Sequence, residues 1–324
     1  MRRMWFGMQA SAAMALAFVI VFAAQPGRGT AHASDLNVGV TIKPSHSIVA
    51  AVMDGVATPT LLIDGAASPH TFTLKPSDAK ALAAAQVVFR VSDGLEPFMG
   101  KVVKSLPKSV QVVALEKVSG LTLHKLRSGG TFEDHDHGSS GKHSHGHKHD
   151  KGGAGIDGHI WLDPSNAALI APHVADVLAT ARPDDASRFK ANADTFVRGI
   201  ATLNDELATR LAPLAGRPFI VFHDAYQYFE KRFGLQAAGS VTVSPDLAPS
   251  AKRLSALRAK IGRLKAVCVF AEPQFEPRQI VTITENTTAK RGVLDPLGAS
   301  IPAGADHYAA LLLKMAADFV ECLM

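Results

Sequence analysis

The feature that most constrains the fold of this chain is its regular alternation of short apolar runs with stretches of helical pattern. Val-rich runs of this kind are typical of strands that are buried on both faces. Parallel strands need a long crossover connection, which is usually a helix, so the alternation predicts parallel sheets. The fold class is expected to be α/β, with two lobes that each hold a roughly four-stranded parallel sheet flanked by helices. The expected strands are residues 36–42, 60–63, 87–91, 110–115, 219–222, 235–243, 266–271 and 292–294.

An uninterrupted helical pattern lies between the two halves, from Pro183 to Pro213. A helix of about 28 residues would be about 42 Å long, enough to run along both lobes. The chain of 324 residues also exceeds the size at which one core usually keeps growing. We therefore expect a rigid two-lobed body, with an N-terminal lobe at 34–182, a linking helix at 183–213 and a C-terminal lobe at 214–324. The apolar stripe of the linking helix is Phe189, Phe196, Ile200, Leu203, Leu207 and Leu211.

The remaining helices are placed from their periodicity and from residues that favour helix ends. Ser77 is expected to be the N-cap of one helix, because a serine hydroxyl can accept a hydrogen bond from the first turn. Pro164 is expected to lie at the start of another. The other expected helices are residues 47–56, 98–106, 225–233, 249–262, 277–288 and 305–322.

The N-terminus has the pattern of a segment that directs export. Two arginines precede an apolar stretch at residues 4–24, and the small-residue sequence Ala31-His32-Ala33 follows. We expect residues 1–33 to be a cleaved signal peptide; an uncleaved membrane anchor is the alternative. The pattern leaves open whether export uses the general or the twin-arginine route. The net charge is +5, but no basic run is interleaved with aromatic residues, so a nucleic-acid partner is not expected.

The chain has two cysteines, Cys268 and Cys322. Because an exported protein meets an oxidising environment, we expect them to form a disulfide; two buried free thiols are the alternative. Closing a loop of about 54 residues would stabilise the fold by roughly 4 kcal/mol on the chain-entropy account. The bridge would join the last helix to the strand at 266–271.

One segment, residues 128–155, interrupts the alternation and consists mostly of Gly, His, Ser and Asp. It has almost no apolar residue, so it cannot add to a core and is expected to be a loop. Imidazoles at alternating positions bind borderline metals such as Zn²⁺, Cu²⁺ or Ni²⁺. We expect an auxiliary metal-binding loop; a polar spacer that is His-rich by chance is the alternative. The candidate ligands are His135, His137, His143, His145, His147 and His149.

A second set of candidate ligands is dispersed along the chain, next to the carboxyl ends of expected strands. Ligands gather at this edge in parallel α/β units, because loops and helix N-termini converge there. Three imidazoles and one carboxylate suit the softness and tetrahedral preference of Zn²⁺. Taken singly, each of these residues is more often structural; their joint placement favours a metal site. The set is His70, His159, His223 and Asp295, and Glu272 is expected to accept a hydrogen bond from a ligating imidazole.

At these residues the chain resembles the periplasmic zinc-binding component of bacterial high-affinity zinc ABC importers, within the cluster A-I family of metal solute-binding proteins. The resemblance implies two lobes joined by a long helix, with the metal ligands at His70, His159, His223 and Asp295. It also implies a periplasmic, monomeric receptor whose partners are a membrane permease and its ATPase. The resemblance rests on the segments Ser68-Pro69-His70, Lys75-Pro76-Ser77-Asp78, and residues 158–164, 222–226, 270–275 and 294–298.

The third ligand position separates metals within this family. This chain has His223 at that position, which resembles the zinc importers. Manganese and iron importers of the family are expected to have Glu there. The His-rich segment and the cysteine pair are also marks of the zinc branch. One departure concerns Pro69, because some zinc members have an acidic residue immediately before the first ligand. An additional carboxylate contact at this position is therefore not expected.

Three other functions are weighed against zinc capture for import. A manganese or iron receptor of the same family is one, and a periplasmic zinc buffer or adhesin is another. A secreted zinc hydrolase is the third, since three histidines with an open position can activate water. The chain has no HExxH motif, so it is not expected to be an enzyme. It has no GxxxxGK[ST] loop either, so the ATPase that drives transport is expected in another chain.

Overall fold

The structure is a computed structural model that describes residues 36–127, 155–242 and 249–324, together with residues 1, 132 and 245. By its internal contacts the chain divides into Met1–Ser34 and a compact unit, Asp35–Met324. The expected signal peptide therefore lies, apart from its first residue, outside the described residues. Within the described part of the chain, no helix is both long and apolar enough to cross a membrane.

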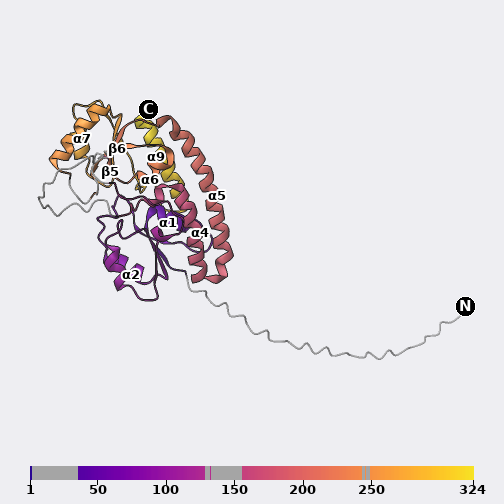
Figure 1. The fold of residues 1–324 in the computed structure, drawn as a ribbon. Coiled ribbons are helices and arrows are strands. Elements are labelled where there is room, and N and C mark those ends of the chain that lie inside the picture. Colours follow the sequence, from indigo (N-terminus) through magenta and orange to yellow (C-terminus); the bar gives the residue numbers. More distant parts are fainter. Residues whose placement is uncertain (2–35, 128–131, 133–154, 243–244, 246–248) are drawn as a thin grey trace. The chain divides into compact units, whose positions relative to one another are not determined.

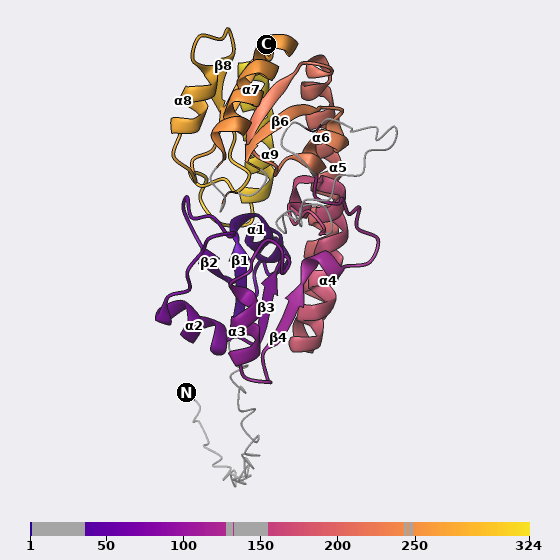
Figure 2. The same ribbon diagram turned by 60° about the vertical axis from the view of Figure 1, so that its left-hand side comes forward.

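Two four-stranded sheets form the framework, and every strand pair in them is parallel. The first sheet has the order β2-β1-β3-β4 and the second has the order β6-β5-β7-β8. Figure 2 shows the first in indigo and purple and the second in orange. The expected α/β class and all eight expected strands are confirmed. The strands are β1 Val38–Ile42, β2 Thr60–Ile63, β3 Val87–Arg90, β4 Gln111–Ala114, β5 Phe219–His223, β6 Ala237–Thr242, β7 Cys268–Ala271 and β8 Lys290–Val293.

Helices supply the crossovers between these strands and cover the sheets (Figures 1 and 2). Helix α5 has 26 residues, which gives a length of about 39 Å. It packs along α4 and also contacts α1, next to the first sheet, and α9, next to the second. The helices are α1 Lys43–Val52, α2 Pro76–Ala83, α3 Met99–Ser105, α4 Pro164–Ala181, α5 Ala186–Leu211, α6 Gln227–Phe233, α7 Ala251–Leu264, α8 Arg278–Thr284 and α9 His307–Leu323.

The long linking helix is thus confirmed, and most of its expected apolar stripe is buried. Phe196 is half-buried and packs against the core. The division of residues 34–324 into two lobes and a linker remains a proposal, because Asp35–Met324 is compact as a whole.

Most helix ends lie within a few residues of the prediction, and three of the differences are informative. Helix α1 begins at Lys43 rather than near Ser47, because Pro44 occupies its first turn and needs no hydrogen-bond acceptor there. Helix α2 begins at Pro76, so the prediction of Ser77 as its N-cap was wrong. There the Asp78 carboxylate accepts the N–H of Lys75 at 3.0 Å, as in a capping box. Helix α8 ends at Thr284 instead of near residue 288.

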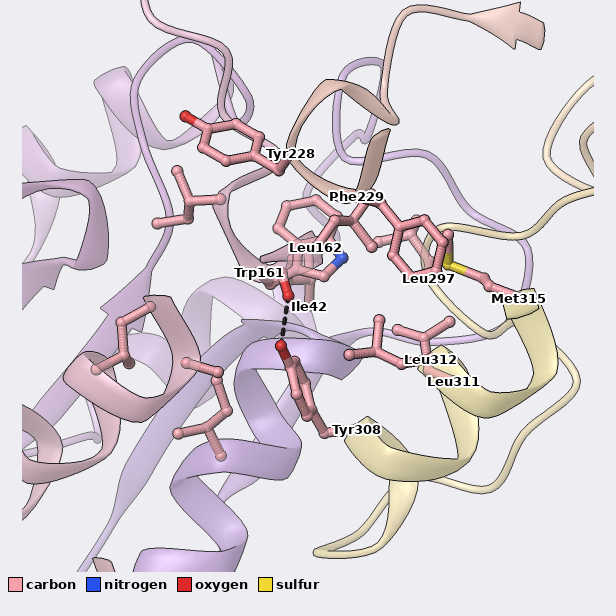
Figure 3. Packing of buried hydrophobic residues seen from close by; sticks show 14 of the residues in the cluster. Ile42, Trp161, Leu162, Tyr228, Phe229, Leu297, Tyr308, Leu311, Leu312 and Met315 are labelled. Atoms are coloured by element: carbon pink, nitrogen blue, oxygen red, sulfur yellow. Dashed lines mark hydrogen bonds between the residues drawn. The ribbon is translucent and has the colours of Figure 1, made fainter. Parts of the chain in front are cut away.

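The largest of three apolar clusters in the described part of the chain includes residues of α1, α4, α5 and α9 and holds the residues around Trp161 in place (Figure 3). The Trp161 indole donates a hydrogen bond to the carbonyl of Pro296 at 2.9 Å. The Trp161 carbonyl in turn accepts one from the Tyr308 hydroxyl at 2.6 Å. Pro296 and Tyr308 follow Trp161 in the sequence by 135 and 147 residues. The backbone beside His159 is therefore fixed by contacts with the C-terminal half of the chain.

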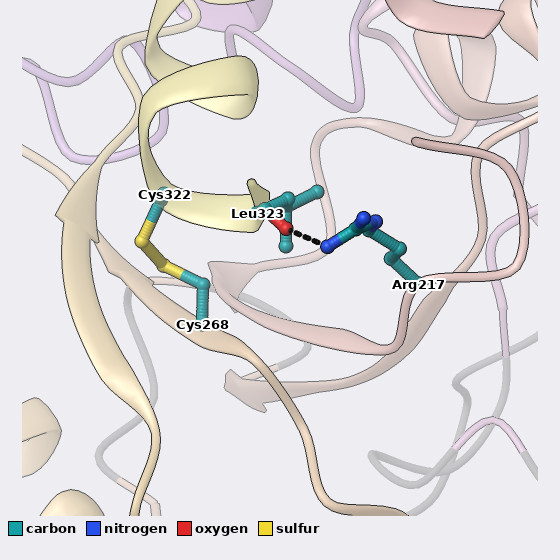
Figure 4. Close-up of a disulfide and its surroundings, with 4 residues drawn as sticks. All are labelled: Arg217, Cys268, Cys322 and Leu323. Carbon is teal, nitrogen blue, oxygen red and sulfur yellow. Dashed lines mark hydrogen bonds between the residues drawn. A yellow bond between two sulfur atoms is a disulfide. The ribbon is translucent and has the colours of Figure 1, made fainter. Parts of the chain in front are cut away.

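The expected disulfide between Cys268 and Cys322 is confirmed (Figure 4). It joins β7 to the last turn of α9, with Cα atoms 5.9 Å apart. Arg217 holds the same end of the helix, because its guanidinium donates to the Leu323 carbonyl at 2.6 Å. The C-terminal helix is thereby fixed to the strand that leads into the candidate site.

A buried acid lies beyond the end of β3. The Glu96 side chain is fully buried, and its Oε2 accepts the N–H groups of Val91 at 2.7 Å and Ser92 at 3.0 Å. Burial raises the pKa of Glu96 to about 7, even though these donors favour the charged form. The folded protein therefore holds a proton here at pH values at which the unfolded chain has released it.

This raised pKa makes stability depend on pH in a defined direction. The stabilising contribution is fully present below the unfolded pKa of 4.5 and is lost as pH rises through about 7. We expect Glu96→Gln to match the wild type at pH 4.5 and to be more stable at pH 8, by on the order of 3 kcal/mol. Urea unfolding of the metal-free protein at both pH values measures this. The exposed control Glu276→Gln should keep the wild-type dependence of the free energy of unfolding on pH. If Glu96→Gln also kept it, this account would be contradicted.

Candidate metal centre

Three imidazoles from separate parts of the chain meet at one point. His70 lies in the loop between β2 and α2, His159 lies just before α4, and His223 is the last residue of β5. One ligand atom from each ring lies within 4.8 Å of the other two. The Nε2 atoms of His159 and His223 are 3.3 Å apart. The loops at the carboxyl edges of the two sheets thus bring together three residues that the sequence separates by up to about half the chain.

The spacing suits a tetrahedral zinc ion. With Zn–N bonds of about 2.0–2.1 Å, two ligands at a tetrahedral angle are about 3.3–3.4 Å apart. The separation of 3.3 Å between the Nε2 atoms of His159 and His223 agrees with that edge length. Two lone pairs facing each other at this distance repel unless a cation or a proton lies between them. The donor atoms are therefore arranged for an ion of this size.

The cavity in which they meet is small. It leaves about 10 Å³ for the centres of water-sized molecules, which is room for about one ion or one water. Sites for organic ligands are usually tens of times larger. The cavity is lined by Ser68, Pro69, His70, His159, Trp161, His223, Glu272, Gln274, Phe275, Pro296 and Leu297.

Asp157 orients His159. Its Oδ1 lies 2.7 Å from His159 Nδ1 and also accepts the His159 backbone N–H at 3.0 Å. A carboxylate can only accept, so Nδ1 carries the proton and the lone pair of Nε2 faces the other two rings. Asp157 was missed in the sequence analysis, although its place two residues before His159 was a usable signal.

Glu272 does the same for His223, as expected from the sequence. Its Oε2 lies 2.6 Å from His223 Nδ1, and its Oε1 accepts the His223 backbone N–H at 3.2 Å. Burial by itself would lower the pKa of His223, but the negative charge and hydrogen bond of Glu272 outweigh it and raise this pKa. Fixing the tautomer and increasing the basicity of an imidazole are what supporting carboxylates do in metal sites.

His70 differs from the other two rings. Its Nε2 is buried and has no hydrogen-bond partner among the residues that the structure describes. Burial, followed by the nearby charges of His159 and His223 when protonated, lowers the pKa of His70 to about 2. This ring is therefore neutral at physiological pH, with a buried nitrogen that lacks a partner. Such a group is rare unless it has a ligand.

Asp295 lies outside this three-histidine group. Its carboxylate accepts the backbone N–H groups of Leu297, Gly298 and Ala299 and the side-chain amide of Gln274. These bonds close the loop that follows β8 and occupy both carboxylate oxygens. In this arrangement Asp295 shapes the wall of the cavity rather than sharing the point at which the imidazoles meet.

The two ends of the His-rich segment lie beside the centre. Leu126 donates its N–H to the carbonyl of Gly155 at 3.0 Å, and the N–H of Asp157 donates to the carbonyl of His124 at 2.8 Å. The segment therefore leaves and returns next to the carboxylate that orients a candidate ligand. The auxiliary ligands expected in it, namely His135, His137, His143, His145, His147 and His149, lie outside the described residues.

Removing the charge of Glu272 tests the support that it gives His223. We expect Glu272→Gln to weaken zinc binding by about 10–100-fold, because an amide no longer forces the Nδ1–H tautomer or increases ring basicity. Competition against a chromogenic chelator measures the affinity. The exposed control Glu276→Gln should bind as the wild type does. Wild-type affinity in Glu272→Gln would show that the pair is only structural.

The sequence pattern of one protein family matches most of this chain. Residues 38–322 match the ZnuA family, described as zinc-uptake complex component A, periplasmic. The chain belongs to this family. A relative in Brucella abortus (strain 2308), named high-affinity zinc uptake system protein ZnuA, is 43% identical over 304 residues, covering 88% of this chain and 91% of the relative. The family match extends over both sheets and all three histidines.

Solved structures agree on the architecture. A crystal structure of ZnuA has a TM-score of 0.71 and 25% identity, covering 88% of this chain and 99% of that one. The periplasmic zinc-binding protein TroA from Treponema pallidum has a TM-score of 0.75 over 89% of this chain and 99% of that one. Its identity is 20%, so this likeness concerns the fold alone. The family is described as a component of zinc-uptake complexes, and the two solved structures support the α/β fold described above.

Proposed function

We propose that this chain captures Zn²⁺ in the periplasm with His70, His159 and His223 and delivers it to the permease of an ABC importer. The observation that carries the proposal is the convergence of three imidazole nitrogens within 4.8 Å of one another, two of them separated by the 3.3 Å edge of a zinc tetrahedron. Family membership supports the transport role. Asp295, expected from the sequence as a fourth ligand, is here assigned to holding the cavity wall through its four hydrogen bonds.

The charges around the site suit a divalent cation. The carboxylates of Asp157 and Glu272 are both buried, and each reaches the centre through an imidazole. Together they offset the two positive charges of the ion without touching it. Three neutral nitrogen donors favour Zn²⁺ over Mn²⁺ or Fe²⁺, which prefer more oxygen ligands or bind more weakly to a given site. Zinc is therefore proposed as the cargo rather than manganese or iron.

Capture and release follow from where the ligands are attached. His70 and His159 belong to the loops around the first sheet, whereas His223 ends a strand of the second. A small rearrangement that separates His223 from the other two would break the tetrahedral geometry and release the ion. We propose that docking on the permease causes this rearrangement, and that an ATPase in another chain drives transport. The room for about one ion supports a receptor without catalytic activity.

The remaining parts of the proposal concern the ends of the chain and the His-rich segment. Residues 1–33 are proposed to be a signal peptide that is removed on export. The six histidines between residues 133 and 150 are proposed to bind additional zinc more weakly, because the segment must become ordered to do so. The mature protein is proposed to act as a monomer without a nucleic-acid partner.

Zinc titration of mature protein and of a variant lacking residues 133–150 tests these assignments. The wild type should bind one Zn²⁺ tightly and further equivalents weakly, and the deletion should remove only the weak ones. Equal stoichiometry in both proteins would show that the segment binds no metal. Loss of the tight site on deletion would contradict the assignment to the three histidines.

Import is tested separately in cells. A zinc-limited bacterium that expresses the cognate permease and ATPase should take up radioactive zinc only when this chain is present. The His70→Ala variant should fail to support uptake although it is exported to the same level. Uptake that continues with His70→Ala would favour a buffer or adhesin function.

A further inference from the structure

Gln274 is an unexplained polar residue in the wall of the cavity. It lies two residues after Glu272, in the loop that follows β7, and lines the same cavity as the three histidines. Its Oε1 is buried and has no hydrogen-bond partner in the part of the chain that the structure describes. Among the residues that line the cavity, only His70 Nε2 shares this property within the described ranges. Buried polar atoms without a partner are rare and usually indicate a ligand or an ordered water.

The orientation of the Gln274 amide follows from its other hydrogen bond. Its Nε2 donates to Asp295 Oδ1 at 2.8 Å. Asp295 also accepts three backbone N–H groups, so it is an acceptor and must face the nitrogen of the amide rather than the oxygen. The oxygen is therefore the end of the Gln274 amide that remains for a partner in the cavity. The Asp295 charge also polarises the amide and makes that oxygen a stronger acceptor.

A tetrahedral ion held by three imidazoles has a fourth position, and the other lining residues are poorly suited to fill it. The Pro69 side chain has no atom that can bind a metal or accept a hydrogen bond. Both oxygens of Glu272 are engaged by His223. The Trp161 indole N–H is used by the Pro296 carbonyl. These contacts leave Gln274 as the wall residue with a free buried acceptor.

We propose that Gln274 is a positioning residue for the fourth zinc ligand. Water occupies the fourth position, and Gln274 Oε1 accepts a hydrogen bond from it. This inference rests on the proposed binding of zinc by the three histidines. It has a further consequence, because the negative end of the amide dipole then faces the fourth position. The site accordingly favours a neutral, hydrogen-donating water over an anion.

Azide provides a probe of this arrangement, because it replaces a metal-bound water but cannot donate a hydrogen bond. The test uses the disulfide-bonded mature protein and the variant Gln274→Leu, which removes the acceptor and its dipole. Zinc affinity is measured by chelator competition, and azide affinity is measured on the Co²⁺-loaded protein from its visible absorption. Gln279→Leu is the matched control, because Gln279 Oε1 is also buried without a partner among the described residues but does not line the cavity.

Gln274→Leu should bind zinc about tenfold more weakly, which corresponds to one lost hydrogen bond to a polarised donor. It should also bind azide about tenfold more tightly, while Gln279→Leu leaves both affinities unchanged. A merely destabilised site would lose affinity for both, so the opposite directions are specific to the proposal. Wild-type azide affinity in Gln274→Leu, or weaker azide binding, would overturn it.

The failure of this inference can be told apart from a failure of the proposed function. If His70→Ala keeps wild-type zinc affinity, the assignment of zinc binding to the three histidines is wrong. If His70→Ala loses zinc but Gln274→Leu keeps the wild-type affinities for zinc and azide, only the role of Gln274 is wrong. Thermal unfolding of metal-free Gln274→Leu controls for folding, because Asp295 retains its three backbone donors.

Discussion

Replacing His223 with alanine should weaken zinc binding by more than 100-fold. His223 supplies one of three nitrogen ligands, so its loss exceeds the 10–100-fold effect of removing only a supporting hydrogen bond. It also leaves the buried Glu272 carboxylate without its imidazole partner, which lowers the stability of the metal-free protein. Chelator competition and urea unfolding should therefore both change.

His70→Ala separates these two effects. His70 Nε2 has no hydrogen-bond partner among the described residues, and no carboxylate is paired with this ring in the described hydrogen bonds and ion pairs. We expect zinc affinity to fall as far as in His223→Ala, with much less loss of stability. His173→Ala, a half-buried position on α4, is the control and should bind zinc normally. Unchanged zinc affinity in both site variants would refute the three-histidine assignment.

Replacing Arg127 with methionine should produce the largest loss of stability. The Arg127 guanidinium lies between two buried carboxylates: it donates to Asp224 through Nε and Nη2 and to Glu230 at 2.9 Å. Asp224 and Glu230 are 3% and 2% exposed, so they cannot be solvated in its absence. Removing one partner of a buried ion pair costs about 3–5 kcal/mol, and here two charges of the same sign remain. The free energy of unfolding from urea titration should fall by at least that amount.

A surface pair gives the matched control for this effect. Arg210 pairs with Glu206 on α5, where the side chains are 49% and 41% exposed. Arg210→Met should change the free energy of unfolding by less than about 1 kcal/mol. Arg127→Lys should fall between the wild type and Arg127→Met, because one ammonium cannot bind both carboxylates in the bidentate manner of a guanidinium. A loss in Arg127→Met no larger than in Arg210→Met would contradict the account of this cluster.

The Arg127 cluster also bears on the metal centre. Asp224 directly follows His223, and Arg127 directly precedes the His-rich segment. Arg127 also covers the ring of Phe132 at 3.9 Å from its centroid. The same guanidinium thus fixes the chain next to a candidate ligand and the start of the segment that is proposed to bind additional zinc.

The sequence predicted most of the fold because its periodic patterns are local. Strand positions follow from short apolar runs, and α5 follows from a stripe that continues without interruption. Helix starts were less accurate, since they depend on single contacts such as the Asp78 carboxylate with the Lys75 N–H. The alternation of strands and helices was a stronger signal than any one cap.

The candidate site was predicted in part. His70, His159 and His223 could be found because His223 ends a strand, His70 lies in the loop that follows a strand, and His159 lies just before a helix. The roles of Asp157 and Gln274 could not be found in the same way, because they depend on which atom of a side chain faces which neighbour. Asp295 likewise occupies the expected sheet edge, but its hydrogen bonds to the following backbone decide what its carboxylate does. The placement of a residue is encoded locally; its bonding is decided by segments that meet only in the folded chain.

The most direct test of the central claim is a crystal structure of the zinc-loaded mature protein, with anomalous diffraction measured on both sides of the zinc absorption edge. The account predicts a strong zinc peak about 2.0–2.1 Å from a nitrogen of each of His70, His159 and His223. Zinc found only on the His-rich segment, or bound by fewer than two of these three rings, would contradict it.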